Sequence, residues 1–159
     1  MAQARLMTRE ADYRRLNLKK NEIEMWEDGK RDDDRSGVVE WWYFDAILDD
    51  GSKIAACYST KIQPMMAAKG THACLKFDIT RPDGKQVSKR VTKFKSVTFS
   101  KDKCDVRWDN NCFIGDMKTY HIKAEPVDGY GFDVVLESES SPWRGETGHI
   151  GFEQNDEKY

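Results

Sequence analysis

The chain of 159 residues has no long apolar run. A helix that spans a bilayer needs about 20 consecutive apolar residues. Here charged residues make up 34% of the sequence, and the mean hydropathy is -0.80. Residues 1–20 also lack the apolar stretch of a secretory signal. We therefore exclude a membrane-spanning protein and predict a cytoplasmic location.

The chain also has no large excess of charge of either sign. The chain has 26 basic and 28 acidic residues, interspersed along the sequence, and a net charge of -2. Such a mixture creates no field of one sign that would attract phosphates, and no nucleic-acid-binding motif is present. The sequence thus predicts no nucleic-acid partner.

Metal-binding and disulfide patterns are absent too. The cysteines are Cys57, Cys74, Cys104 and Cys112. No two of them form a Cys-x-x-Cys pair, which favours reduced thiols packed as small hydrophobic groups. The histidines are His72, His121 and His149. Because dispersed histidines are more often simple hydrogen-bonding residues than ligands, we predict neither a metal nor a cofactor.

The most informative feature present is a run of four aromatic residues flanked by two carboxylates. The run is Glu40, Trp41, Trp42, Tyr43, Phe44 and Asp45. In a strand alternate side chains point to opposite faces, so Glu40, Trp42 and Phe44 share one face. Either face could line a pocket for an apolar ligand, or both could be covered by protein. Periodicity does not choose between the faces because both are aromatic.

From residue 38 onward the sequence predicts short strands separated by turns. Asp-Gly pairs at 50–51, 83–84 and 128–129 are hairpin signals. The predicted strands cover 38–48, 53–61, 73–80, 86–94, 96–99, 104–108, 119–125 and 132–137. This pattern indicates an all-β fold, an antiparallel β-barrel or strongly curved sheet over residues 38–139.

The start of the chain has a different composition. Residues 1–21 are rich in charge and predict a short N-terminal arm, in which Thr8 could cap a helix running through Tyr13 and Leu16. Residues 21–27 alternate apolar and polar side chains and predict a short strand. The β domain is then expected to cover residues 22–159.

Four segments resemble one protein family. They are WEDGKRDD at 26–33, EWWYFDAILDDGSKIAACYSTK at 40–61, TRPDGK at 80–85 and DGYGFDVVLESESSPWRGETGHIGF at 128–152. Together they look like the amino-terminal half of the carotenoid 1,2-hydratase (hydroxyneurosporene synthase) family. This is an AttH-like, lipocalin-related group that also contains pericyclases described as Diels-Alderases.

The resemblance implies a lipocalin-like β-barrel that works beside a second domain, with a polyene or terpenoid held near their junction. The chain stops where the family continues, so we expect a homodimer or a partner chain that supplies the second half. No catalytic residue of that second domain is carried over. The family commonly has Pro-Gly after Trp-Arg, whereas Gly145 and Glu146 follow Trp143 and Arg144 here.

Three functions fit these features. The first is a hydratase- or cyclase-type enzyme for a lipophilic isoprenoid or polyene-like substrate, which needs a dry cavity, an acid and aromatic faces that stabilise a carbocation. Its candidate acids are Asp45 and Glu40; the alternative for each is a surface residue or a hydrogen-bonding partner of the backbone. The candidate ligand-binding residues are Trp41, Trp42, Tyr43, Phe44, Tyr58, Trp143, Arg144 and His149. The second function is a carrier of an apolar small molecule. The third is a half-domain that functions only in a dimer or complex.

Overall fold

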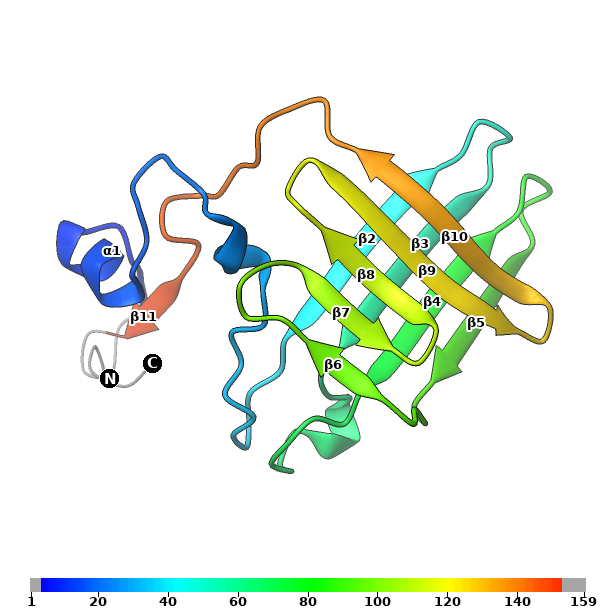
Figure 1. Ribbon diagram of the computed structural model, residues 1–159, viewed down its shortest axis with the longest axis horizontal. Coiled ribbons are helices and arrows are strands. Elements are labelled where there is room, and N and C mark those ends of the chain that lie inside the picture. Colours follow the sequence, from blue (N-terminus) through cyan, green and yellow to red (C-terminus); the bar gives the residue numbers. More distant parts are fainter. Residues whose placement is uncertain (1–3, 153–159) are drawn as a thin grey trace. The chain divides into compact units, whose positions relative to one another are not determined.

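The computed structural model describes residues 4–152 (Figure 1). The chain divides into two compact units. The larger unit contains residues 25–138, and the smaller contains the described parts of both chain ends, residues 4–24 and 139–152.

The larger unit consists of two antiparallel sheets, each a meander of consecutive strands (Figure 1). The four-stranded sheet has the order β2 (Trp41–Ile47), β3 (Lys53–Ser59), β4 (Cys74–Thr80) and β5 (Gln86–Val91). The five-stranded sheet has the order β10 (Tyr130–Glu137), β9 (Thr119–Val127), β8 (Asn111–Gly115), β7 (Asp105–Trp108) and β6 (Val97–Phe99). Two short 3-10 helices cover Met25–Asp28 and Gln63–Met65. The predicted antiparallel, mostly β class is confirmed.

The two sheets do not close into a barrel. Within the described residues each sheet keeps its own hydrogen-bonded order, so neither β5 with β6 nor β2 with β10 forms a ladder. Instead, inward-facing side chains of both sheets form a single core. The Phe44 ring of β2, for example, lies 5.3 Å from the Phe132 ring of β10 in an edge-to-face contact.

The three Asp-Gly turns form the predicted hairpins β2–β3, β4–β5 and β9–β10. Their glycines Gly51, Gly84 and Gly129 have φ between 81° and 82°, the left-handed region that glycine adopts without steric cost.

Two local predictions were wrong. Residues 21–27 form no strand; the Trp26 carbonyl instead accepts a hydrogen bond from the Gly29 N–H (3.0 Å), which turns the chain into the 3-10 helix. Conversely, strand β8 lies between the strands predicted over 104–108 and 119–125 and was not predicted, because Asp109, Asn110 and Asn111 are residues typical of turns. The Asn111 side chain stays inside the sheet, donating to the Trp108 carbonyl and accepting from the Glu125 N–H, each at 2.8 Å.

The smaller unit contains helix α1 (Glu10–Leu16) and an antiparallel pair of β1 (Ala4–Leu6) and β11 (Ile150–Phe152). The predicted helix is confirmed, but its cap is Arg9 rather than Thr8, and the Arg9 N–H donates to the Asp12 carboxylate (2.9 Å). Met7 and Tyr13 are buried, so the segment expected as an arm has a small core. No helix within residues 4–152 combines the length and the apolar character needed to cross a membrane.

Candidate functional site

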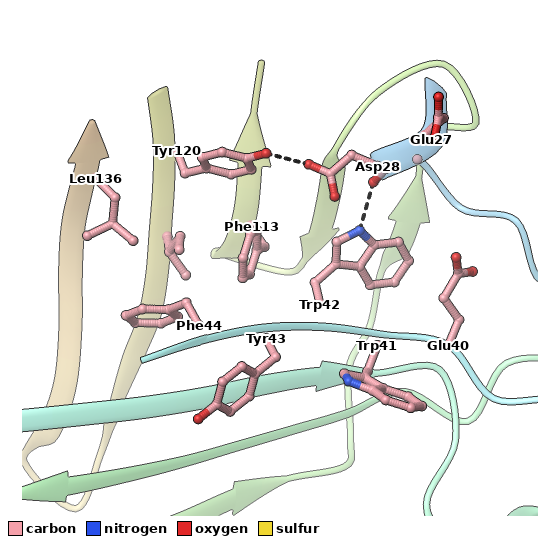
Figure 2. A pocket seen from close by; sticks show the side chains of 12 residues that line it. Glu27, Asp28, Glu40, Trp41, Trp42, Tyr43, Phe44, Phe113, Tyr120 and Leu136 are labelled. Carbon is pink, nitrogen blue, oxygen red and sulfur yellow. Dashed lines mark hydrogen bonds between the residues drawn. The ribbon is translucent and has the colours of Figure 1, made fainter. Parts of the chain in front are cut away.

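Strand β2 turns the two faces of its aromatic run in opposite directions (Figure 2). Trp42 is 5% exposed and stacks on Phe99 of the other sheet, with 5.5 Å between ring centroids. Trp41 is 59% exposed, and Tyr43 is exposed on the same side. The structure therefore assigns the face with Trp42 and Phe44 to the interior, a choice that the alternation alone left open.

A pocket of about 370 Å³ lies where this face of β2 meets the five-stranded sheet (Figure 2). Its lining residues are Glu27, Asp28, Gly29, Glu40, Trp41, Trp42, Tyr43, Phe44, Phe113, Tyr120, Ile122 and Leu136. All of them belong to the larger unit. A concave site of mainly aromatic and aliphatic side chains with a few polar groups is the usual form of a small-molecule site.

Asp28 is one of three acids in the lining of this pocket, with Glu27 and Glu40. It is the last residue of the first 3-10 helix, and its carboxyl Oδ2 accepts a hydrogen bond from the Tyr120 hydroxyl (2.6 Å). Its backbone carbonyl accepts another from the Trp42 indole N–H (3.0 Å; Figure 2). Burial raises the pKa of the Asp28 carboxyl, although the hydrogen bonds from Tyr120 and Cys104 act in the opposite direction.

The phenol of Tyr120 reaches Asp28 because the residue opposite it is a glycine. Gly115 on β8 pairs with Tyr120 on β9, and a Cβ atom at Gly115 would lie 2.1 Å from the Tyr120 ring. The missing side chain thus provides the space in which the ring lies. Burial, with the Asp28 contact as the next cause, raises the pKa of Tyr120, so this phenol remains a hydrogen-bond donor.

A second glycine positions the Asp28 segment. A Cβ atom at Gly29 would lie 2.7 Å from the backbone of Lys101, and the next residue, Lys30, donates its N–H to the Ser100 carbonyl (2.7 Å). The segment after Asp28 therefore runs directly against the 100–103 turn, which fixes the carboxyl beside the pocket.

The two acids proposed from the sequence have other surroundings. Glu40 borders the pocket, but its carboxylate accepts hydrogen bonds from the backbone N–H groups of Arg31 (2.9 Å) and Asp32 (3.0 Å). Asp45 lies on the exposed face of β2 and accepts a hydrogen bond from the Tyr43 hydroxyl (2.8 Å). This bond is the largest cause of the raised pKa of Tyr43.

Two of the proposed ligand-binding residues have structural partners. Tyr58 is fully buried in the core and donates its hydroxyl to the Lys123 carbonyl, and it does not line the pocket. In the smaller unit, His149 Nδ1 lies 2.6 Å from the Thr147 carbonyl.

Trp143 and Arg144 come together in a depression of the smaller unit. Trp143 is 86% exposed. The Arg144 guanidinium donates to the carbonyls of Lys19 and Glu146, each at 2.7 Å, and the Glu146 carboxylate accepts from the Tyr13 hydroxyl (2.7 Å). These bonds brace the loop.

Comparisons of the chain with models of protein families, with curated proteins and with solved structures found no match. Within residues 4–152, no cluster of three or more histidine, cysteine, aspartate or glutamate residues could hold a metal ion. The function is therefore argued from the pocket itself. Sequence reasoning missed Asp28 and Tyr120 as site residues, although Asp28 stands in the WEDGKRDD segment that carries part of the family resemblance.

Proposed function

We propose that the larger unit is a lipocalin-like domain of a hydratase- or cyclase-type enzyme that acts on a lipophilic, isoprenoid-like substrate. The single observation that carries this proposal is the partly buried carboxyl of Asp28 in the wall of an aromatic pocket. Acid-promoted addition to a carbon–carbon double bond needs such a carboxyl and aromatic faces close to it. Asp28 thus takes the role that the sequence suggested for Asp45 or Glu40.

The proposed step transfers one proton. The Asp28 O–H bond breaks while the π electrons of the substrate form a new C–H bond, which leaves a carbocation and a carboxylate. The faces of Trp42, Phe44 and Phe113 would stabilise the cation, and Tyr120 would stabilise the carboxylate through its existing hydrogen bond. Water then adds to the cation and the resulting oxonium ion returns a proton to the Asp28 carboxylate. Alternatively, a second double bond of the substrate adds to the cation, and the new carbocation loses a proton from an adjacent carbon to the carboxylate.

Proton transfer to carbon can be measured with a terpene alkene such as myrcene in deuterium oxide, because the first step would form a C–D bond. Asp28→Asn is expected to lower deuterium incorporation by at least ~100-fold, since the amide is no acid. Asp45→Asn is the matched control and should have no effect. Equal incorporation by the wild type and Asp28→Asn would refute the role of Asp28.

A carrier without catalysis is the second candidate, because the same aromatic lining suits simple binding. Displacement of the neutral fluorescent probe N-phenylnaphthylamine distinguishes the two functions. A carrier would bind myrcene in this assay and incorporate no deuterium in the wild type.

We also propose that the chain associates with a second copy through β2. Within the described residues β2 pairs only with β3, and its exposed face carries Trp41 and Ile47. A strand that is paired on only one side favours pairing with another strand. Light scattering at micromolar concentration should give a dimer mass, and Ile47→Lys should give a monomer, because an edge lysine blocks pairing. A monomeric wild type would exclude this association.

A further inference from the structure

Several polar groups that border the pocket already form hydrogen bonds within the protein. The Glu40 carboxylate is engaged by two backbone N–H groups, and the indole N–H of Trp42 by the Asp28 carbonyl. The Tyr120 hydroxyl points at Asp28 Oδ2. The second carboxyl oxygen of Asp28 points away from Tyr120, toward the space beside Phe113 and Trp42 (Figure 2).

The Tyr120 bond favours one position for the proton of a neutral Asp28. When the phenol donates to Oδ2, that oxygen is the acceptor, which favours the carboxyl O–H on Oδ1. The Asp28 group that faces the ligand is then a hydrogen-bond donor beside the aromatic and aliphatic side chains of the pocket.

A ligand without an acceptor would leave this donor unpaired. A hydrocarbon that fills the pocket displaces water from Asp28 and offers nothing in return, and burying an unpaired polar group is costly. A carbonyl or hydroxyl oxygen restores the bond. The volume of about 370 Å³ lies near the lower end of the ~300–1,000 Å³ typical of small-molecule sites, which favours a compact ligand.

We propose that the pocket selects compact apolar molecules that carry one carbonyl or hydroxyl oxygen over hydrocarbons of the same shape, with Asp28 as the donor to that oxygen and Tyr120 as its positioning residue. The inference rests on the proposed function for the existence of the site and refines its substrate class. It also adds a second reaction, the loss of water from an alcohol. With a tertiary or allylic alcohol, the Asp28 proton moves to the hydroxyl oxygen, the C–O bond breaks and water leaves. The product is the same type of carbocation that hydration forms from an alkene.

The binding test compares β-ionone, a small isoprenoid ketone, with the hydrocarbon in which two hydrogens replace its carbonyl oxygen. The affinity of each compound is measured by displacement of N-phenylnaphthylamine from the protein. The wild type should bind the ketone about 10-fold more tightly, the value of one satisfied hydrogen bond. Asp28→Leu should bind both compounds equally. Asp45→Asn is the control and should keep the preference.

The pH dependence of ketone affinity tests whether Asp28 donates a hydrogen bond or is only part of an apolar wall. Ketone affinity should fall as the pH rises through the titration of Asp28, because a carboxylate cannot donate. Asp28→Asn should retain the preference, since its amide N–H₂ donates, but lose this pH dependence. Tyr120→Phe should move the midpoint to higher pH, because it removes a hydrogen bond that lowers the pKa of Asp28.

Other titratable groups near Asp28 must be considered in that profile. Glu27 and Glu40 border the pocket, and Cys104 contacts the Asp28 carboxyl. Because these groups remain in Asp28→Asn, a pH dependence that persists in this variant would assign the effect to them and overturn the proposal.

Three further results would contradict the proposal in different ways. Equal wild-type affinity for ketone and hydrocarbon would overturn this inference and leave the proposed function standing. A preference for the ketone that persists in Asp28→Leu would show that another residue is the hydrogen-bond donor. Binding of neither compound would overturn both proposals. If Asp28→Leu does not fold, the pH profiles of Asp28→Asn and Tyr120→Phe still decide the question.

Discussion

Replacing Trp42 by alanine is expected to lower the free energy of unfolding by about 3–5 kcal/mol, the cost of truncating a large buried aromatic side chain. The indole is 5% exposed, stacks on Phe99 and donates to the Asp28 carbonyl. Its loss would create a cavity and release the segment that carries the acid. Trp41→Ala should change stability by no more than about 0.5 kcal/mol, because Trp41 is 59% exposed.

Urea denaturation of the two variants measures this difference between adjacent residues of the same type. Binding of N-phenylnaphthylamine under native conditions is the second readout. It should fall further in Trp42→Ala than in Trp26→Ala, because Trp26 does not line the pocket. Equal destabilisation by the Trp41 and Trp42 substitutions would contradict the assignment of faces in β2.

Replacing Gly115 by alanine is the second change with a large expected effect. The new methyl group would lie 2.1 Å from the Tyr120 ring, so the ring must move. Overpacking of this kind typically costs about 1–3 kcal/mol, and the moved phenol would lose its bond to Asp28. We therefore expect lower stability together with a shift of the ketone-binding profile to higher pH, as in Tyr120→Phe.

A glycine in a turn provides the control for that substitution. Gly84 has a φ of 81° and open space around its Cα, so Gly84→Ala introduces backbone strain of about 1 kcal/mol and no clash. Urea denaturation should show a smaller loss than for Gly115→Ala, and the binding profile should not shift. A Gly115→Ala protein with wild-type stability and an unchanged profile would show that the Tyr120 ring has room to move without losing Asp28.

The hairpins could be predicted from the sequence because their signals are local. Asp-Gly pairs and alternating side chains lie within a few residues of each turn. Strand β8 lacked such a signal, since it begins with Asn111 and ends with Gly115, residues more typical of turns. The 3-10 helix at Met25–Asp28 was mistaken for a strand because a few alternating residues do not show whether a partner strand exists.

The acid of the site could not be predicted in the same way. Asp28 and Tyr120 are 92 residues apart in the sequence, and only tertiary structure brings them together. Burial, which raises the pKa of Asp28, is likewise a property of the fold. Glu40 and Asp45 were conspicuous because they flank the aromatic run, yet one binds backbone N–H groups and the other faces outward. Trp42 and Phe44 could be named as candidate lining residues from the sequence, because the aromatic run is visible there.

The strand pairings also bear on how the chain folds. In the larger unit every hydrogen-bonded pair joins strands that follow one another in the sequence. Such local pairings require short loop closures, a property associated with rapid folding. The pair of β1 and β11 joins Ala4–Leu6 to Ile150–Phe152, so its closure spans almost the whole chain. Because the entropic cost of closure grows with loop length, the two ends meet more readily once residues 25–138 have folded and shortened the path between them.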